Sequence, residues 1–264
     1  MFGPALIAGW AAVRHRRWTV HALQQRCGAR LFTVTVNGID EVMTFDAFLE
    51  AVVSASLPSV SIFDPSFDFD APELLNDYSV PAPFGDKCDL LAALPSELRP
   101  DFRWFLVGPA GSGSKLHVDV LQTTAWNALI VGEKQWVIAE PNSSLAGETS
   151  DAQSWFADTL PELVARSSKE SGAAADPRLF TFTQRAGETV VVPRGWYHAV
   201  LNTAPWAVAV THNFVCPSEP DLDAFIGAYA AAASAGASPL TPAQLAACDQ
   251  LMRRRLVDLH STCC

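Results

Sequence analysis

The stretch ETVVVPRGWYHAVLN, residues 188–202, decides the fold of this chain. It consists of two short apolar runs that meet at a tight turn. Pro193 ends the first run because it cannot donate to a sheet, and Gly195 permits the sharp reversal. We therefore predict two neighbouring strands, the second of which carries His198 inward.

Short apolar runs of the same kind recur along the middle of the chain. Turn residues such as Gly132 and Gly187 separate them. About eight short strands separated by such turn residues are typical of a double-sheet jelly roll or cupin-like barrel. The predicted strands are Val60–Phe63, Phe102–Val107, Thr123–Val131, Lys134–Ala139, Leu179–Thr183, Glu188–Val192, Tyr197–Asn202 and Trp206–Val215. We predict a mainly β fold, a double-stranded β-helix with N-terminal and C-terminal helical additions.

This pattern divides the chain into three parts. Residues 1–58 form a mixed, partly helical extension, residues 59–217 the jelly-roll domain and residues 218–264 a helical extension. In the first part we expect helices at Trp18–Cys27 and Thr44–Ser54, with Thr44 as N-cap, and a strand at Leu31–Val36. Asn142–Pro177 is an insertion that is helical at Trp155–Arg166 and mobile at its Ser/Gly/Ala-rich end.

The C-terminal helix carries one apolar face. Its members recur at steps of three and four: Leu245, Cys248, Met252, Leu256 and Leu259. Such a face either packs on the barrel or makes a homodimer contact, and the pattern fits both alternatives.

Composition narrows the class of protein. About half of the 264 residues are apolar, enough for a sizeable core, and the formal charge of -10 argues against broad nucleic-acid binding. No apolar run reaches the roughly 18 residues of a membrane span.

The six cysteines include no CxxC pair, which leaves a zinc ribbon unsupported, and their scatter suits a reducing compartment. The positive charges follow the apolar N-terminus instead of preceding it, so we expect no secretory signal and an intracellular protein, in nucleus or cytoplasm.

Three residues have the chemistry of a metal site. His117 and Asp119 are two apart, so on an extended chain both point to the same side. With His198 they supply two imidazoles and one carboxylate, the facial triad that holds ferrous iron and leaves three positions open. Those positions suit a chelating 2-oxo acid and O2. Zinc fits the same ligands.

A dianionic 2-oxo acid also needs a cation at its far end. Lys134 is one of only four lysines and begins an apolar strand. It is either a snorkelling edge residue or, beside an iron site, the partner of that carboxylate. Further polar residues on neighbouring strands could add contacts: Thr123, Thr124, Asn127, Thr211 and Asn213.

Two segments resemble the Jumonji-C oxygenases. They are HVDVLQTTAWNALIVGEKQW, residues 117–136, and residues 187–202, in which spacing and flanking residues agree together. Weaker likeness continues at Ile62-Phe63-Asp64, Arg103-Trp104-Phe105 and Thr211-His212-Asn213-Phe214, so that the resemblance covers more than half of the chain. Within the family, the likeness is strongest to a lysyl hydroxylase.

The resemblance implies a role for each matching residue. His117, Asp119 and His198 would bind Fe(II), and Lys134 would pair with the distal carboxylate of 2-oxoglutarate. The remaining cosubstrate contacts would be Asn127, Thr211 and Ser114, where a threonine is usual. The implied activity is a 2-oxoglutarate-dependent dioxygenase that uses O2 to hydroxylate a protein side chain, with lysine favoured.

One position departs from the family pattern. The similar lysyl hydroxylase has a cosubstrate-binding tyrosine directly before its Ile-Phe-Asp, whereas this chain has Ser61. We expect its pocket to lack one contact. Alternatives are a different substrate (an Asn or His side chain, a tRNA base or an N-methyl group that is removed) and a non-catalytic cupin-like binding protein.

Overall fold

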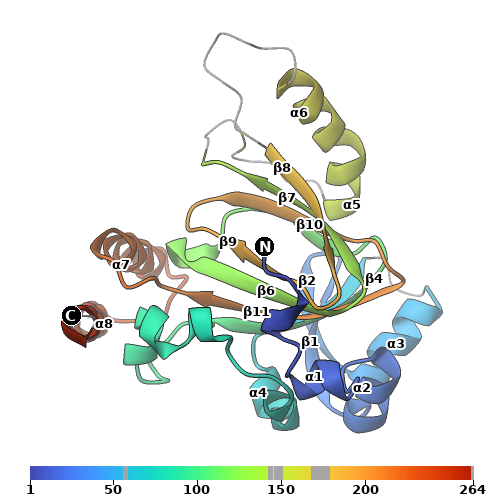
Figure 1. Cartoon of the computed structure of the whole chain (residues 1–264), viewed down its shortest axis with the longest axis horizontal. Coiled ribbons are helices and arrows are strands. Elements are labelled where there is room, and N and C mark those ends of the chain that lie inside the picture. Colours follow the sequence, from blue (N-terminus) through green and yellow to red (C-terminus); the bar gives the residue numbers. More distant parts are fainter. Residues whose placement is uncertain (56–58, 142–144, 146–150, 168–178, 263–264) are drawn as a thin grey trace.

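The computed structural model folds the chain around two antiparallel β-sheets that face each other (Figure 1). It describes residues 1–55, 59–141, 145, 151–167 and 179–262. The larger sheet has seven strands in the order β2-β1-β3-β4-β11-β6-β9, and the smaller has four in the order β5-β10-β7-β8. The predicted jelly roll is confirmed.

The strands lie close to the predicted runs. They are β1 (Leu31–Val36), β2 (Ile39–Thr44), β3 (Val60–Asp64), β4 (Arg103–Pro109), β5 (Gly113–His117), β6 (Thr124–Val131), β7 (Glu133–Ala139), β8 (Leu179–Arg185), β9 (Thr189–Val192), β10 (Tyr197–Asn202) and β11 (Trp206–Phe214). Two of them, β2 and β5, are additions to the prediction, because their sequences lack a regular alternation of apolar and polar residues.

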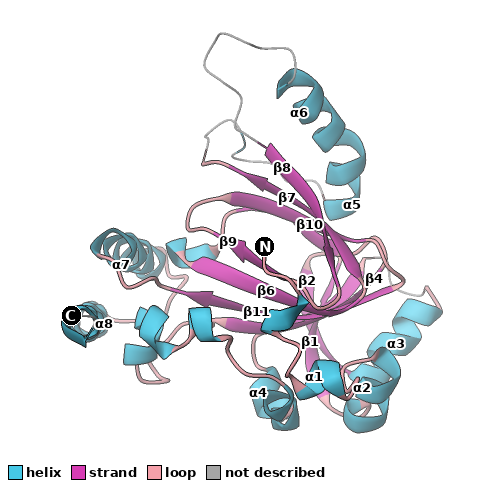
Figure 2. Cartoon of the chain, in the orientation of Figure 1, coloured by secondary structure: helices cyan, strands magenta, loops and turns pink. Residues whose placement is uncertain are grey.

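Helices surround the sheets in three groups (Figure 2). They are α1 (Ala11–Arg14), α2 (Val20–Cys27), α3 (Phe45–Val53) and α4 (Phe67–Asp70) near the N-terminus, α5 (Ala152–Ser154) and α6 (Leu160–Ser167) in the insertion, and α7 (Glu219–Ser234) and α8 (Pro242–Thr262) near the C-terminus. The expected helices at 18–27 and 44–54 are therefore present. The side chain of Thr44 caps α3, as predicted, by accepting from the backbone N–H of Ala47.

The large sheet has two different faces because successive side chains on a strand point to opposite sides. On β4, Phe105 and Val107 are buried in the main core, which the N-terminal helices complete. Trp104, Leu106 and Gly108 alternate with them and line a cavity on the other side, which Val107 also borders. The N-terminal extension thus packs on the outer face of the sheet and leaves the inner face to the cavity.

The N-terminal extension is also joined to the large sheet by strand pairing. β1 pairs with both β2 and β3. The predicted domain boundary after residue 58 stays a prediction, as does the one after residue 217.

The apolar face of the C-terminal helix is occupied within the chain. Cys248, Met252 and Leu256 on α8 are at most 3% exposed and pack in one cluster with residues of α7 and of the 3-10 turn Leu90–Ala93. Of the two alternatives, the structure therefore places this face in an intramolecular core. Self-association of the chain stays a prediction.

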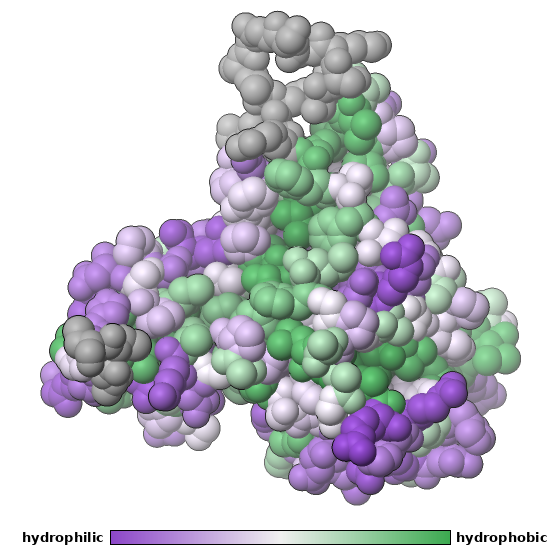
Figure 3. Space-filling view, viewed as in Figure 1, coloured by the Kyte–Doolittle hydropathy of each residue, from purple (hydrophilic) through white to green (hydrophobic). Residues whose placement is uncertain are grey.

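The insertion supports the small sheet from outside. Trp155 and Phe156, in a short π-helical turn before α6, pack against Leu116 and Ala199, the sequence neighbours of His117 and His198. In Figure 3, hydrophobic side chains gather in the upper part of the view, where Figure 1 shows the small sheet and α6. The predicted mobile segment Ser168–Asp176 lies outside the described residues. Within the described residues, none of the helices has the length and apolar character of a membrane span.

Candidate metal centre

A cavity of about 340 Å3 lies between the inner faces of the two sheets. The large sheet contributes side chains of β3, β4, β6, β9 and β11, and the small sheet contributes those of β5, β7 and β10. The predicted site residues that line it are Ser61, Ser114, His117, Asp119, Asn127, Lys134, His198, Thr211 and Asn213. Thr123 and Thr124 are not part of its wall.

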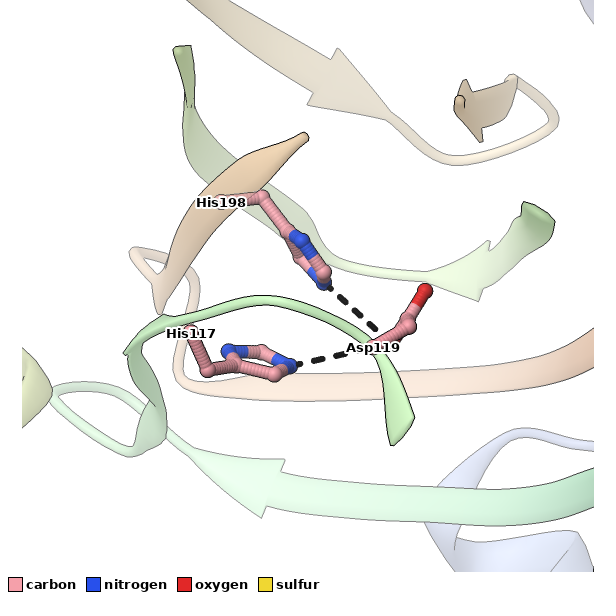
Figure 4. A group of neighbouring side chains, drawn as sticks. All are labelled: His117, Asp119 and His198. Carbon is pink, nitrogen blue, oxygen red and sulfur yellow. Dashed lines mark ion pairs between the residues drawn. The ribbon is translucent and has the colours of Figure 1, made fainter. Parts of the chain in front are cut away.

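The fold brings the three proposed metal ligands together from distant parts of the sequence. His117 ends β5 and is the cross-strand partner of His198 on β10. The two imidazole centroids are 4.1 Å apart. Asp119 follows the end of β5, and its Oδ1 lies 3.8 Å from His117 Nε2 and 3.7 Å from His198 Nε2 (Figure 4). One donor atom from each residue lies within 4.8 Å of the other two.

Backbone carbonyls orient both imidazoles. Nδ1 of His117 is 2.7 Å from the carbonyl oxygen of Lys115, and Nδ1 of His198 is 3.4 Å from that of Trp196. A carbonyl can only accept, so each Nδ1 carries a proton and donates. Nε2 of each ring then faces Asp119, which is the arrangement found in histidines that bind metals.

The charges at this centre favour a cation. Burial, with a smaller contribution from His117, lowers the pKa of His198 to about 3, so the ring is neutral at pH 7 and its contact with Asp119 is not an ion pair. Burial raises the pKa of Asp119, and its Oδ2 is buried without a hydrogen-bond partner. A carboxylate that is partly unpaired beside two neutral imidazoles fits a divalent metal ion.

Lys134 is a buried ammonium without a counter-charge. It is 5% exposed, and among the described residues no hydrogen bond or ion pair reaches its Nζ. Burial lowers its pKa to about 8. A snorkelling lysine would extend to solvent. Lys134 instead lines the cavity, where an anionic ligand would offset the cost of burying its charge.

The other polar residues predicted to contact the cosubstrate differ in which of their side-chain atoms already have a hydrogen-bond partner. Asn127 is 6% exposed, and its Oδ1 is buried without a partner. Thr211 already donates its hydroxyl to the carbonyl of Trp126, at 2.8 Å. Asn213 donates to Thr123 Oγ1, at 2.8 Å, and so braces the wall beside Asp119.

Three residues at the site were not predicted from the sequence. Trp136 stacks on His198, Gln184 binds the Trp136 indole, and Asn202 lies opposite Lys134. Asn202 and Trp136 are each an even number of residues from a predicted site residue on the same strand, and this spacing places them on the same face. Gln184 has no comparable signal, because its position depends on pairing between β7 and β8.

Comparison with known proteins gives matches over the same region. Residues 104–214 match the family model "JmjC domain, hydroxylase". The chain is 33% identical over 80% of its length to "Lysine-specific demethylase JMJ21" of Arabidopsis thaliana, of which it covers 23%. Identity is also 33%, over 80% of the chain, with "Bifunctional arginine demethylase and lysyl-hydroxylase psr-1" of Caenorhabditis elegans, of which it covers 55%. The chain is also 33% identical to human "2-oxoglutarate and iron-dependent oxygenase JMJD4". This match spans 44% of the chain and 27% of the relative. The chain thus spans about half or less of these relatives.

Proposed function

From the premise that this chain carries a JmjC domain in residues 104–214, we propose that it is an Fe(II)- and 2-oxoglutarate-dependent dioxygenase that hydroxylates a protein side chain. The observation that carries the proposal is one cavity with two features. Two histidines converge on Asp119 at one position, and an unpaired lysine is buried at another. A metal and a dianionic 2-oxo acid together satisfy both.

Each group in the cavity has a distinct part in this proposal. His117, Asp119 and His198 would hold the metal, and Lys134 would bind the far carboxylate of 2-oxoglutarate. Asn127, Thr211 and Ser114 would line the cosubstrate. When bound, iron supplies the O2 chemistry that couples conversion of 2-oxoglutarate to succinate and CO2 with hydroxylation of a C–H bond.

The metal centre is most exposed to solvent at His117. The side chain of His198 is 7% exposed and that of Asp119 16%, whereas that of His117 is 37% exposed. Phe63 and Val120, which line the same cavity, are 45% and 64% exposed. The substrate would therefore enter past His117, and the buried inner end would exclude water from the cosubstrate.

Lysine is the favoured target, and its support is the named lysyl-hydroxylase activity of the psr-1 relative. The same name includes arginine demethylation, which proceeds by oxidation of an N-methyl carbon, so that this reaction is the second candidate. Hydroxylation of Asn or His and oxidation of a tRNA base have no specific support in the cavity. A non-catalytic cupin-like role leaves the unpaired Lys134 unexplained.

For the location, we propose the nucleus or the cytoplasm. The support is the absence of a spanning helix among the described residues, together with four free cysteines there, two of them buried.

The direct test is succinate production by the purified protein with Fe(II), ascorbate and 2-oxoglutarate. We expect turnover in the wild type and none in His198→Ala, which should keep its fold by circular dichroism and lose affinity for Co(II) or Zn(II). Turnover that survives in His198→Ala refutes the assigned metal centre. Mass spectrometry of lysate proteins for an added oxygen, about 16 mass units, then identifies the target residue.

A further inference from the structure

Asn202 lies at the inner end of the cavity beside Lys134. It ends β10 four residues beyond His198, and its cross-strand partner on β7 is Lys134. Asn202 is 8% exposed, Lys134 is 5% exposed, and both line the cavity. Directly opposed residues on one face of antiparallel strands have side chains within reach of each other.

The hydrogen bonds of Ser112 determine how the Asn202 amide is turned. Ser112 Oγ donates its one proton to the carbonyl of Pro109, at 2.6 Å. It can therefore only accept from Asn202, which lies 2.9 Å away, so the atom that faces it is Nδ2. This leaves Oδ1 and the second N–H of Asn202 without partners among the described residues.

The backbone holds Asn202 in this position. Its N–H donates to the carbonyl of Ser112, at 2.8 Å, and its own carbonyl accepts from Gly111, at 2.9 Å. Gly108 leaves the space that the amide needs, because a Cβ there would lie 2.3 Å from Ser112 Oγ and 2.9 Å from Asn202 Nδ2. The amide is thus oriented before any ligand arrives, which lowers the entropic cost of binding.

We propose that Asn202 and Lys134 together form the subsite for the far carboxylate of a dianionic 2-oxo acid, an inference that rests on the proposed cosubstrate. With the ligand bound, Asn202 Oδ1 would accept one N–H of the Lys134 ammonium and direct the remaining N–H groups at the carboxylate. The second N–H of Asn202 donates to the same carboxylate. Asn202 would thus add a neutral donor beside the charged ammonium.

The proposal is tested with Asn202→Asp and Asn202→Ala in the full chain loaded with Zn(II), which prevents turnover. Calorimetry would compare 2-oxoglutarate with 2-oxopentanoate, which has the same carbon chain without the far carboxylate. The new carboxylate of Asn202→Asp pairs with Lys134 and repels the ligand. We expect it to weaken 2-oxoglutarate binding at least tenfold, and Asn202→Ala to weaken it about three- to tenfold. Neither should change 2-oxopentanoate binding.

Gln135→Glu is the matched control. It makes the same charge change one residue from Lys134, on the opposite face of β7, so affinity should stay at the wild-type value. Wild-type affinity for 2-oxoglutarate in Asn202→Ala overturns the proposal, whatever Asn202→Asp does. Equal loss for both ligands also overturns it, because the defect is then not at the far carboxylate. A wild type that binds neither acid refutes the proposed cosubstrate itself.

Discussion

The indole of Trp136 stacks on the imidazole of His198, with centroids 6.2 Å apart and an interplanar angle of 19°. Gln184, which is fully buried, holds the indole by accepting from its Nε1 at 2.8 Å. The Gln184 amide donates to the carbonyls of Asn127 and Glu188, both at 3.0 Å. One buried amide therefore connects the ring behind a proposed metal ligand with the backbone of a proposed cosubstrate contact.

Trp136→Phe should separate the hydrogen bond from the stacking. Phenylalanine keeps a ring over His198 but leaves Gln184 Oε1 buried without a donor, which costs about 1–3 kcal/mol. We expect a loss of that size in the free energy of unfolding by urea titration, with little change in Co(II) affinity. Trp136→Leu also removes the ring, and its Co(II) affinity should fall further. Equal metal affinity in both variants would mean that the ring does not position His198.

The pKa of Lys134 gives 2-oxoglutarate binding a pH dependence. Burial lowers this pKa to about 8, and a bound carboxylate favours the charged form. Above about pH 8, binding must therefore take up a proton, and affinity should fall up to tenfold per pH unit. Calorimetry at about pH 9 in two buffers with different ionisation enthalpies measures this uptake. Lys134→Met is the control, since it should bind more weakly and take up no proton; a wild type that takes up none contradicts the assignment.

Ser61→Tyr should strengthen cosubstrate binding. Ser61 lines the cavity, as the resemblance implies, but its hydroxyl reaches less far than that of a tyrosine. A restored contact is worth about 0.5–1.5 kcal/mol, or up to about tenfold in the apparent Michaelis constant for 2-oxoglutarate. The rate constant should not rise, because the contact serves ground and transition states alike. An unchanged Michaelis constant would show that Asn202 or Thr211 already fills the role, and a loss of folding would show that the cavity is packed around the small residue.

Gly113→Ala should loosen the strand that carries His117. A Cβ at Gly113 would lie 1.9 Å from the carbonyl oxygen of Val200, so β5 would have to move away from β10. We expect a lower melting temperature and weaker Co(II) binding. Gly227→Ala is the control: nothing lies within 4 Å of the added carbon on helix α7, and the change should be neutral or stabilise by up to about 1 kcal/mol. A Gly113→Ala variant as stable as the wild type would contradict the close approach of β5 to β10.

Asp89 should make the fold less stable at neutral pH than at mildly acid pH. Its carboxylate accepts from the N–H groups of Leu91 and Val215, but burial outweighs these bonds and raises its pKa to about 6. An unfolded aspartate titrates near 3.9. The folded state thus holds the proton more tightly, and stability falls as the pH rises from about 4 to about 6.

Asp89→Asn removes the buried charge and keeps an acceptor oxygen. Chemical denaturation should show a gain of about 3 kcal/mol at about pH 8 and at most about 0.5 kcal/mol at about pH 4, because the pKa of Asp89 rises by about two on folding. The same gain for Asp89→Asn at both values would show that titration of Asp89 is not its cause.

Local sequence was sufficient for most of the fold. Apolar alternation between turn residues located nine of the strands, and the N-cap at Thr44 located the start of α3, because both signals depend only on neighbouring residues. The His-x-Asp spacing with the distant His198 was likewise enough to propose the metal ligands. The strands β2 and β5 gave no such signal, since their apolar side chains do not alternate with polar ones and their extended form depends on the strands beside them.

Where a sequence pattern fits two structural arrangements, only the tertiary structure decided between them. The apolar stripe on α8 fits a dimer contact and an internal core equally well, and its burial depends partly on the 3-10 turn Leu90–Ala93, which is far away in sequence. An ammonium that snorkels and one that is buried have the same sequence context, so only the burial of Lys134 in the folded structure distinguishes them. Asn202 and Gln184 join the site because antiparallel register sets them opposite Lys134, and register is a property of paired strands rather than of either strand alone.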